Sequence, residues 1–243
     1  MSHAECRACA HDPAHPCGFT PDILELMRPN KEREGAGRFT PSVLLGCARR
    51  SVLQSRVDYY EDVNQQWPRT RGSMVHAMME KSEYPGHEVI RERRLEMTVE
   101  TKYGPQRFTG KPDTIVLPNK IIDYKTTGKI ELTAAKPDHI MQLNMYRLLA
   151  HSELGLDITE LEIMYLSMSA VRRFSSATVL SEKRRKETVT LAQIPLPSYE
   201  QILSWVTKQI EKVLEGDEKL PPIWDKTDLC FFCPVRKTCE EFA

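Results

Sequence analysis

Charged side chains interrupt a stretch of the chain whose other residues have the pattern of two buried strands. The stretch runs from Gly110 to Thr127 (GKPDTIVLPNKIIDYKTT), and its β-branched and apolar residues flank a central Pro-Asn turn. The charged residues are Asp113, Asp123 and Lys125. Because an unpaired charge is costly to bury, charged groups at such positions pair with one another or hold a metal ion.

The spacing of these three residues indicates a chemistry. The predicted strands are residues 114–117 and 120–124. In that hairpin Asp113 lies opposite Asp123, and the alternation of side chains puts Lys125 on the same face as Asp123. Two neighbouring carboxylates repel each other unless a cation lies between them, and hard oxygen ligands suit Mg²⁺ or Mn²⁺. A lysine beside that ion activates water or stabilises charge on a phosphate, which is the chemistry of phosphodiester hydrolysis.

A purely structural role for these charges is the alternative. In that interpretation Asp123 forms a salt bridge with Lys125 or with Lys111, and the hairpin binds no metal ion. The three charged residues by themselves do not decide between the salt bridge and the catalytic site.

Three motifs, in this order along the chain, resemble those of one nuclease superfamily. Gly72 to His76 resembles the GxxxH helix motif of RecB-like nucleases. Pro112-Asp113 with Asp123-Tyr124-Lys125 resembles the PD-(D/E)XK signature, and Gln142 to Tyr146 resembles the QxxxY helix motif. The resemblance covers roughly residues 38 to 242 and favours the nuclease interpretation over the salt bridge.

This resemblance implies a fold, a reaction and a set of site residues. The fold is α/β, with a restriction-endonuclease-like core in which helices flank a central mixed sheet. The reaction is Mg²⁺- or Mn²⁺-dependent hydrolysis of DNA, as an exonuclease on single-stranded DNA or duplex ends. The implied roles are metal binding by Asp113, Asp123, His76 and the Tyr124 carbonyl, alignment or activation of water by Lys125, and positioning of substrate by Gln142 and Tyr146.

Cysteines near both ends of the chain predict a metal centre. Cys230-x₂-Cys233-Pro with Cys239 is a metal-binding spacing that lacks a fourth ligand. Iron–sulfur RecB-like nucleases, such as the CRISPR-associated protein four family and AddB-type nucleases, pair one cysteine before the core with three after it. This resemblance implies that Cys47 completes a [4Fe–4S] cluster that joins the two ends of the core. Zinc on the same four thiolates is the physical alternative.

The N-terminal residues carry a second group of soft ligands. Residues 1–37 form an expected Cys/His-rich extension, and residues 38–243 the expected nuclease domain. A zinc site in the extension would use three cysteines and one of two histidines. The candidates are Cys6, Cys9 and Cys17 with His15 or His11. The alternative is a leader segment whose cysteines bind nothing.

Composition sets limits on compartment and partners. Lys+Arg and Asp+Glu number 34 each, so a DNA-binding surface would have to be a local basic groove. No apolar run reaches the roughly 20 residues of a membrane span. We therefore expect a cytoplasmic protein whose seven cysteines are thiols or metal ligands. Two other classes stay open: a non-catalytic DNA-binding or adaptation factor, and a structural zinc protein. Partners in CRISPR adaptation or recombination and an oligomeric assembly also stay open.

Local patterns predict the remaining helices and strands. The expected helices are residues 22–28, a helix that starts at Thr40-Pro41 and carries Cys47, and residues 71–79, 137–154 and 199–215. The expected strands are residues 87–100, 161–169, 174–180 and 187–194, with a basic hairpin tip at residues 181–186.

Overall fold

The computed structural model describes most of the chain from Arg38 onward. The described residues are 20, 22–23, 38–57, 63–128, 134–167, 171–175, 183–184, 187–188, 194–219, 230 and 233–241. Asp22 and Ile23 are helical, and the rest of the expected helix 22–28 lies outside the described residues. The candidate zinc ligands Cys6, Cys9, His11, His15 and Cys17 also lie outside them, so that site stays a prediction.

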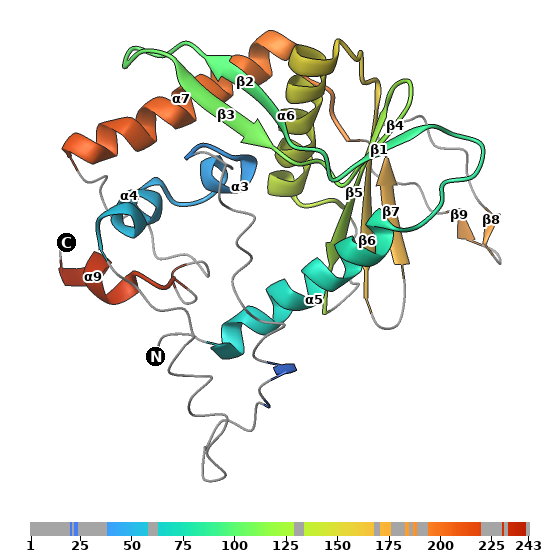
Figure 1. The fold of residues 1–243 in the computed structure, drawn as a ribbon, viewed down its shortest axis with the longest axis horizontal. Helices are drawn as coiled ribbons and strands as arrows, with labels where there is room; N and C mark the ends of the chain where they lie inside the picture. The colour runs from blue at the N-terminus through green and yellow to red at the C-terminus, as the bar shows by residue number, and fades with distance from the viewer. Residues whose placement is uncertain are drawn as a thin grey trace.

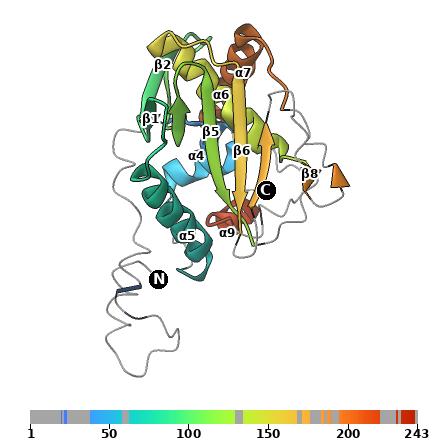
Figure 2. The same cartoon turned by 90° about the vertical axis from the view of Figure 1, so that its right-hand side faces the viewer.

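A five-stranded mixed sheet forms the centre of the fold (Figures 1 and 2), with strand order β1-β4-β5-β6-β7. The strands are β1 (Val89–Arg91), β4 (Thr114–Val116), β5 (Lys120–Thr126), β6 (Glu160–Leu166) and β7 (Val171–Ser175). β5 and β6 are parallel, and the other neighbours are antiparallel. The predicted central mixed sheet flanked by helices is confirmed.

The hairpin that carries the charged residues is formed as expected. β4 and β5 are antiparallel, and Thr114 pairs with Ile122 and Ile115 with Ile121. The next positions outward in this register are Asp113 and Asp123, so the two carboxylates start from neighbouring backbone. Side chains alternate between faces along each strand, and on β5 Asp123 therefore shares the face of Ile121.

Helix α6 (Pro137–Leu154) crosses over from β5 to the parallel strand β6. Pro137 lies in the first turn, where proline's missing N–H costs nothing. Gly155 ends the helix in the left-handed region, at φ 66°, and Leu156 N–H donates to Ala150 O. The predicted bounds of this helix are confirmed.

One face of the sheet, α6 and a second small sheet enclose the main core. β2 (Leu95–Val99) and β3 (Gln106–Gly110) form an antiparallel pair that packs on α6, as does α7 (Tyr199–Glu218). Figure 1 shows α6 between this pair and the central sheet. The buried apolar residues of this core include Ile115, Ile121, Ile163, Leu143, Leu149, Phe108 and Ile210.

Backbone approach at Gly110 is too close for any side chain. A Cβ there would lie 2.6 Å from Leu149 Cδ1 and 3.0 Å from the Tyr146 ring on α6. Both neighbours are buried, so Gly110→Ala must displace them. We expect the free energy of unfolding to fall by about 1–3 kcal/mol, as for other overpacked cores. Urea denaturation measures this. Ala at Gly128, where an added Cβ meets nothing within 4 Å, is the matched control.

Helices α5 (Val63–Glu80) and α4 (Ala48–Arg56) bring further elements to the sheet and to the C-terminus. Met79 of α5 packs against Val116, Ile122 and Tyr124, which face away from α6. α4 contacts α7 and also α9 (Arg236–Glu241), as Figure 1 shows. Elements from the two ends of the domain are therefore neighbours.

Several expected boundaries were wrong because tertiary contacts break the local pattern. The strand expected over residues 87–100 is two strands, β1 and β2, in different sheets, and β3 was not predicted. α5 begins at Val63 rather than at Arg71. The helix expected from Pro41 breaks after α3 (Pro41–Leu44), so Cys47 is the residue that precedes α4.

The C-terminal strands also differ from expectation. β6 ends at Leu166, and β7 begins at Val171, earlier than the predicted strand 174–180. β8 (Lys183–Arg184) and β9 (Glu187–Thr188) form a short antiparallel hairpin at the expected basic tip. α7 continues to Glu218, and the capping box of Ser198 with Gln201 fixes its start.

Candidate active site

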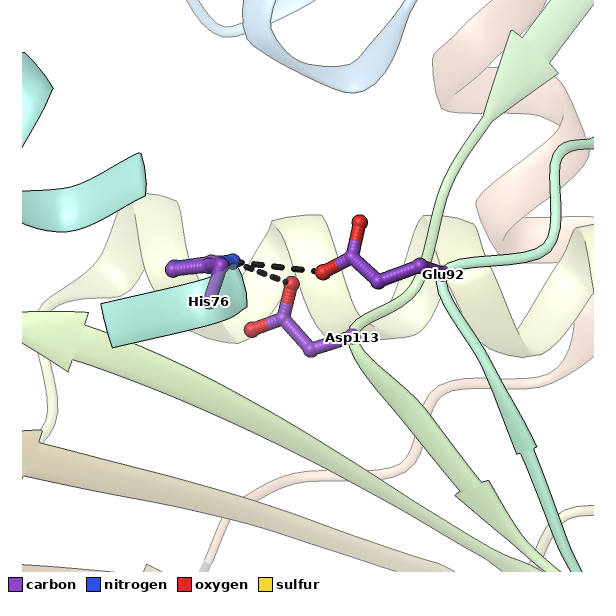
Figure 3. Close-up of side chains that lie close together, drawn as sticks. All are labelled: His76, Glu92 and Asp113. Atoms are coloured by element: carbon purple, nitrogen blue, oxygen red, sulfur yellow. Dashed lines mark ion pairs between the residues drawn. The ribbon is translucent and has the colours of Figure 1, made fainter. Parts of the chain in front are cut away.

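An imidazole and two carboxylates converge at one edge of the hairpin (Figure 3). His76 Nδ1 lies 3.0 Å from Asp113 Oδ1 and 3.5 Å from Glu92 Oε1. The three residues come from α5, from the segment after β1, and from the residue before β4. Among the described residues, this group has ligand atoms that all lie within 4.8 Å of one another, as a metal site requires. His76 and Asp113 were predicted to meet.

Glu92 was missed by the sequence analysis. It lies just after β1, with its backbone in the left-handed region at φ 48°, which non-glycine residues rarely adopt. Its N–H donates to Asp113 O at 3.2 Å, and its carboxylate contacts Lys111 at 2.6 Å. Burial alone would raise the pKa of Glu92, but His76 and Lys111 outweigh it and lower that pKa. The sequence pattern does not show that one strand ends at Arg91 and another begins at Leu95, and this break is what places Glu92 at the site.

Buried Asp123 and half-buried Lys125 form an ion pair on the face of β5 that contacts α6. Lys125 Nζ lies 2.9 Å from Asp123 Oδ1 and 2.7 Å from Oδ2. Asp123 is 1% exposed, and burial raises its pKa to about 6, against the opposing charge of Lys125. Within the described structure Oδ2 receives no hydrogen bond of good geometry, which leaves it available as a ligand atom.

Tyr124 connects the two groups of charges. Its backbone N–H donates to Asp113 Oδ2 at 2.7 Å, which fixes that carboxylate beside β5. The charge of Asp113 in turn contributes to the raised pKa of Asp123. The two carboxylates are therefore electrostatically coupled. The Tyr124 side chain packs on the opposite face of the sheet, so only its backbone belongs to this site. Metal binding by its carbonyl oxygen stays a prediction.

Gln142 and Tyr146 lie together on α6, as their spacing predicted. Gln142 Nε2 donates to Tyr146 Oη at 2.8 Å. Tyr146 is buried, and burial together with the charges of Asp123 and Asp113 raises its pKa well above the usual range. The structure therefore brings the QxxxY pair near the carboxylates.

The chemistry of this donor set fits a hard divalent cation. The carboxylates of Glu92 and Asp113 and the imidazole of His76 form one group among the described residues, and Asp123 lies outside it with one carboxylate oxygen that lacks a hydrogen bond. Carboxylate oxygens suit Mg²⁺ and Mn²⁺, and imidazole favours the softer Mn²⁺. The ammonium of Lys125, which the sequence analysis predicted beside the metal ion, contacts Asp123.

The charge state of His76 makes a pH prediction. Its hydrogen bonds to Asp113 and Glu92 raise its pKa to about 10, from 6.5. The interactions of the protonated His76 ring with Asp113 and Glu92 stabilise the folded, metal-free protein. Their contribution to the free energy of unfolding is complete below pH 6.5 and is lost as the pH rises toward 10. We expect urea midpoints in EDTA to fall more between pH 6.5 and 9.5 for the unmodified protein than for His76→Gln. Equal slopes for the two proteins would contradict the assigned charge state.

The four cysteines of the predicted cluster come from both ends of the domain. Cys47 precedes α4, Cys239 lies on α9, and Cys233 N–H donates to Cys230 O at 3.2 Å. Buried Arg49 of α4 donates from Nε to Cys239 Sγ at 3.1 Å. Burial raises the pKa of the Cys233 thiol, and nearby Cys47 and Cys230 contribute to the increase. Cys47 thus lies close enough to Cys233 to influence its pKa, and a shared metal centre of the four thiols stays a prediction.

A solved structure shares this architecture. The crystal structure of SSO0001 has a TM-score of 0.60 and 14% identity, covering 90% of this chain and 94% of that one. A crystal structure of an alkaline exonuclease (LHK-Exo) from Laribacter hongkongensis has a TM-score of 0.44 and 12% identity, covering 77% of this chain and 93% of that one. No curated protein matches the sequence. The likeness to SSO0001 shows a shared fold.

Two further observations concern membrane spans and family membership. No helix in the described part of the chain is both long and apolar enough to cross a membrane. A family model for the PD-(D/E)XK nuclease superfamily matches residues 83–240, which include the hairpin and α6. Because that range is more than half of the 243 residues, the chain belongs to the PD-(D/E)XK nuclease superfamily.

Proposed function

We propose that this protein is a divalent-metal-dependent deoxyribonuclease that acts as an exonuclease on single-stranded DNA or duplex ends. The observation that carries the proposal is the convergence of His76, Glu92 and Asp113 beside the Asp123–Lys125 pair. Such a group suits hydrolysis of a phosphodiester. Membership of a nuclease superfamily supports the reaction class. The resemblance of the GxxxH and QxxxY motifs to those of RecB-like exonucleases supports the mode of cutting.

We assign Mg²⁺ or Mn²⁺ as the cofactor. Asp113 and Asp123 would hold the ion with His76 and the Tyr124 carbonyl, and Glu92 joins this set because its carboxylate lies beside His76. When bound, the ion polarises the phosphate and lowers the pKa of a bound water. Asp123 Oδ2 has the Lys125 ammonium as an ion-pair neighbour but no hydrogen bond of good geometry from the described residues, and this supports the assignment because a cation would satisfy that oxygen.

Protein groups supply the rest of the chemistry. Lys125 makes two close contacts with the Asp123 carboxylate, so its ammonium has a fixed place beside that proposed metal ligand. It would align the attacking water and stabilise negative charge that develops on the phosphate. The hydrogen-bonded pair of Gln142 and Tyr146 would position the substrate from α6.

A comparison of linear and circular DNA tests the proposal. The purified protein is incubated with end-labelled linear single strands, blunt duplexes and circular single strands, in Mg²⁺, in Mn²⁺ or in EDTA. We expect metal-dependent release of nucleotides from linear DNA and intact circles. Cleavage of circles would show an endonuclease. Binding without cleavage in every metal would instead identify a non-catalytic DNA-binding factor.

Removal of the Glu92 carboxylate tests its place in the metal site. Glu92→Gln keeps the shape of the side chain but removes the charge that faces His76 and Lys111. We expect the Mn²⁺ concentration for half-maximal cleavage to rise about tenfold or more. The exposed Glu88→Gln, four residues earlier, is the matched control and should leave the metal requirement unchanged. An unchanged requirement in Glu92→Gln would exclude this residue from the site.

We also propose that Cys47, Cys230, Cys233 and Cys239 bind a [4Fe–4S] cluster. Four tetrahedral ligands of one zinc ion, at about 2.3 Å each, have sulfur atoms within about 4 Å of one another. In the described part of the chain, no three of these four sulfur atoms all lie within 4.8 Å of one another. In a [4Fe–4S] cluster each thiolate binds a different iron, so the four sulfur atoms lie farther apart than around a single zinc ion. The contact of Arg49 with Cys239 Sγ supports a shared centre between α4 and α9.

Other expectations from the sequence remain proposals. Residues 1–37 would be an extension outside the nuclease domain of residues 38–243. A cytoplasmic location, DNA as the substrate, and a role in recombination, repair or CRISPR adaptation are consistent with the proposed reaction.

A further inference from the structure

A histidine that the sequence analysis did not use lies on the same helix as Gln142 and Tyr146. His139 is in the first turn of α6, three residues before Gln142 and seven before Tyr146. Residues at this spacing share one face of a helix. Its side chain is half-buried, so it is held by protein on one side and remains accessible on the other. The face of α6 that carries the QxxxY pair therefore continues to His139.

A buried tyrosine from β6 fixes this ring in place. Tyr165 is the register partner of Lys125 in the parallel β5–β6 pair, so the two side chains project from the same face of the sheet. Tyr165 Oη accepts a hydrogen bond from Lys136 N–H at 3.0 Å and lies 2.7 Å from His139 Nδ1. The two rings are 5.5 Å apart and tilted by 32°. His139 is thus in contact with Tyr165, which is the strand neighbour of Lys125.

We assign to His139 the neutral tautomer that carries its proton on Nε2. Burial, followed by the charges of Lys125 and Lys136, lowers its pKa to about 4, so the ring is neutral at physiological pH. The Tyr165 hydroxyl already accepts from Lys136 and has one proton to donate, which we assign to Nδ1 of His139. A neutral ring that accepts at Nδ1 carries its proton on Nε2. His139 therefore offers an N–H donor without adding a charge.

We propose that His139 positions the substrate by donating from Nε2–H to a non-bridging oxygen of the DNA phosphate held beside Lys125. The inference rests on the proposed function and extends its substrate site by one residue pair. An anionic phosphate offers the acceptor that this donor needs, and a hydrogen bond to a charged group is stronger than one between neutral groups. Tyr165 acts through His139 by holding its tautomer and orientation, as outer partners do for other functional histidines.

Variants of His139 separate a donor to the phosphate from a purely structural ring. His139→Ala removes the donor, whereas the amide of His139→Gln can supply an N–H at a similar distance. We expect His139→Ala to weaken binding of a fluorescein-labelled single-stranded oligonucleotide in Ca²⁺ about tenfold to hundredfold and to raise KM similarly. His139→Gln should recover most of this loss, with kcat little changed in both variants. The exposed His151→Ala, in the last turn of the same helix, is the matched control.

A double-mutant cycle tests the role of Tyr165. Tyr165→Phe should weaken oligonucleotide binding when His139 is present. It should have no further effect on binding when His139 has been replaced by alanine. Thermal unfolding of each variant reports any separate structural loss. Unchanged binding in His139→Ala, or equal losses in His139→Ala and His139→Gln, would overturn the inference.

These experiments distinguish a wrong role for His139 from a wrong assignment of nuclease activity. A protein that cleaves DNA while His139→Ala binds and cleaves normally refutes only the role of His139. A protein that binds DNA through His139 but cleaves nothing in any metal refutes the nuclease proposal and leaves this role standing. Absence of both binding and cleavage refutes both.

Discussion

Asp123→Asn and Lys125→Ala are each expected to reduce DNA cleavage by at least about a thousandfold. Asp123→Asn keeps the shape of a side chain that is 1% exposed but removes the charge that would hold the metal ion. Lys125→Ala removes the ammonium that contacts both oxygens of Asp123. The measurement is the single-turnover rate of nucleotide release from linear single-stranded DNA at saturating Mn²⁺.

Fold controls make this result interpretable. Asp123→Asn keeps the volume of a buried side chain but leaves the half-buried Lys125 ammonium without its carboxylate partner, so we expect a folded protein of reduced stability. Circular dichroism and thermal unfolding check this for both variants. Asp217→Asn breaks an exposed ion pair with Arg38 and is the matched control for loss of a carboxylate. Full activity in either Asp123→Asn or Lys125→Ala would refute the assigned catalytic site.

Replacement of any one of Cys47, Cys230, Cys233 and Cys239 by serine is expected to remove the iron–sulfur cluster. The anaerobically purified protein should be brown and contain about four irons per chain, and each variant should lose both properties. Because the cluster would connect α4 to α9, its loss should also destabilise the fold by about 3 kcal/mol, or roughly 10 °C in Tm. Visible absorbance, iron and zinc content and thermal unfolding measure the three effects.

The N-terminal cysteines supply the matched control. Serine at Cys6, Cys9 and Cys17 together should leave the iron content unchanged and remove only zinc, if the extension binds zinc at all. Loss of iron in this triple variant would contradict the proposed ligand set. A colourless protein with one zinc that disappears in Cys239→Ser would assign the same four cysteines to zinc instead.

Local patterns in the sequence were enough to predict one part of the site. The β4–β5 hairpin, with Asp113, Asp123 and Lys125, follows from strand alternation and a turn between apolar runs. The bounds of α6 follow from Pro137 at its start and Gly155 after its end, and the four-residue spacing of Gln142 and Tyr146 puts them on one face. In each case the signal lies within one element or two adjacent ones, where backbone geometry is nearly fixed.

Contacts between side chains that are distant in sequence depend on how the elements pack on one another. Glu92 joins His76 because the chain leaves the central sheet between β1 and β2, and the period-two pattern continues through that break without a signal. The contacts of His139 with Tyr165, and of Arg49 with Cys239, join elements that are far apart in sequence. Alternation and helical spacing specify the face on which a residue lies, but the packing of one element on another determines its partner. That is why the sequence located the carboxylates and lysine, while the fold added the residues that surround them.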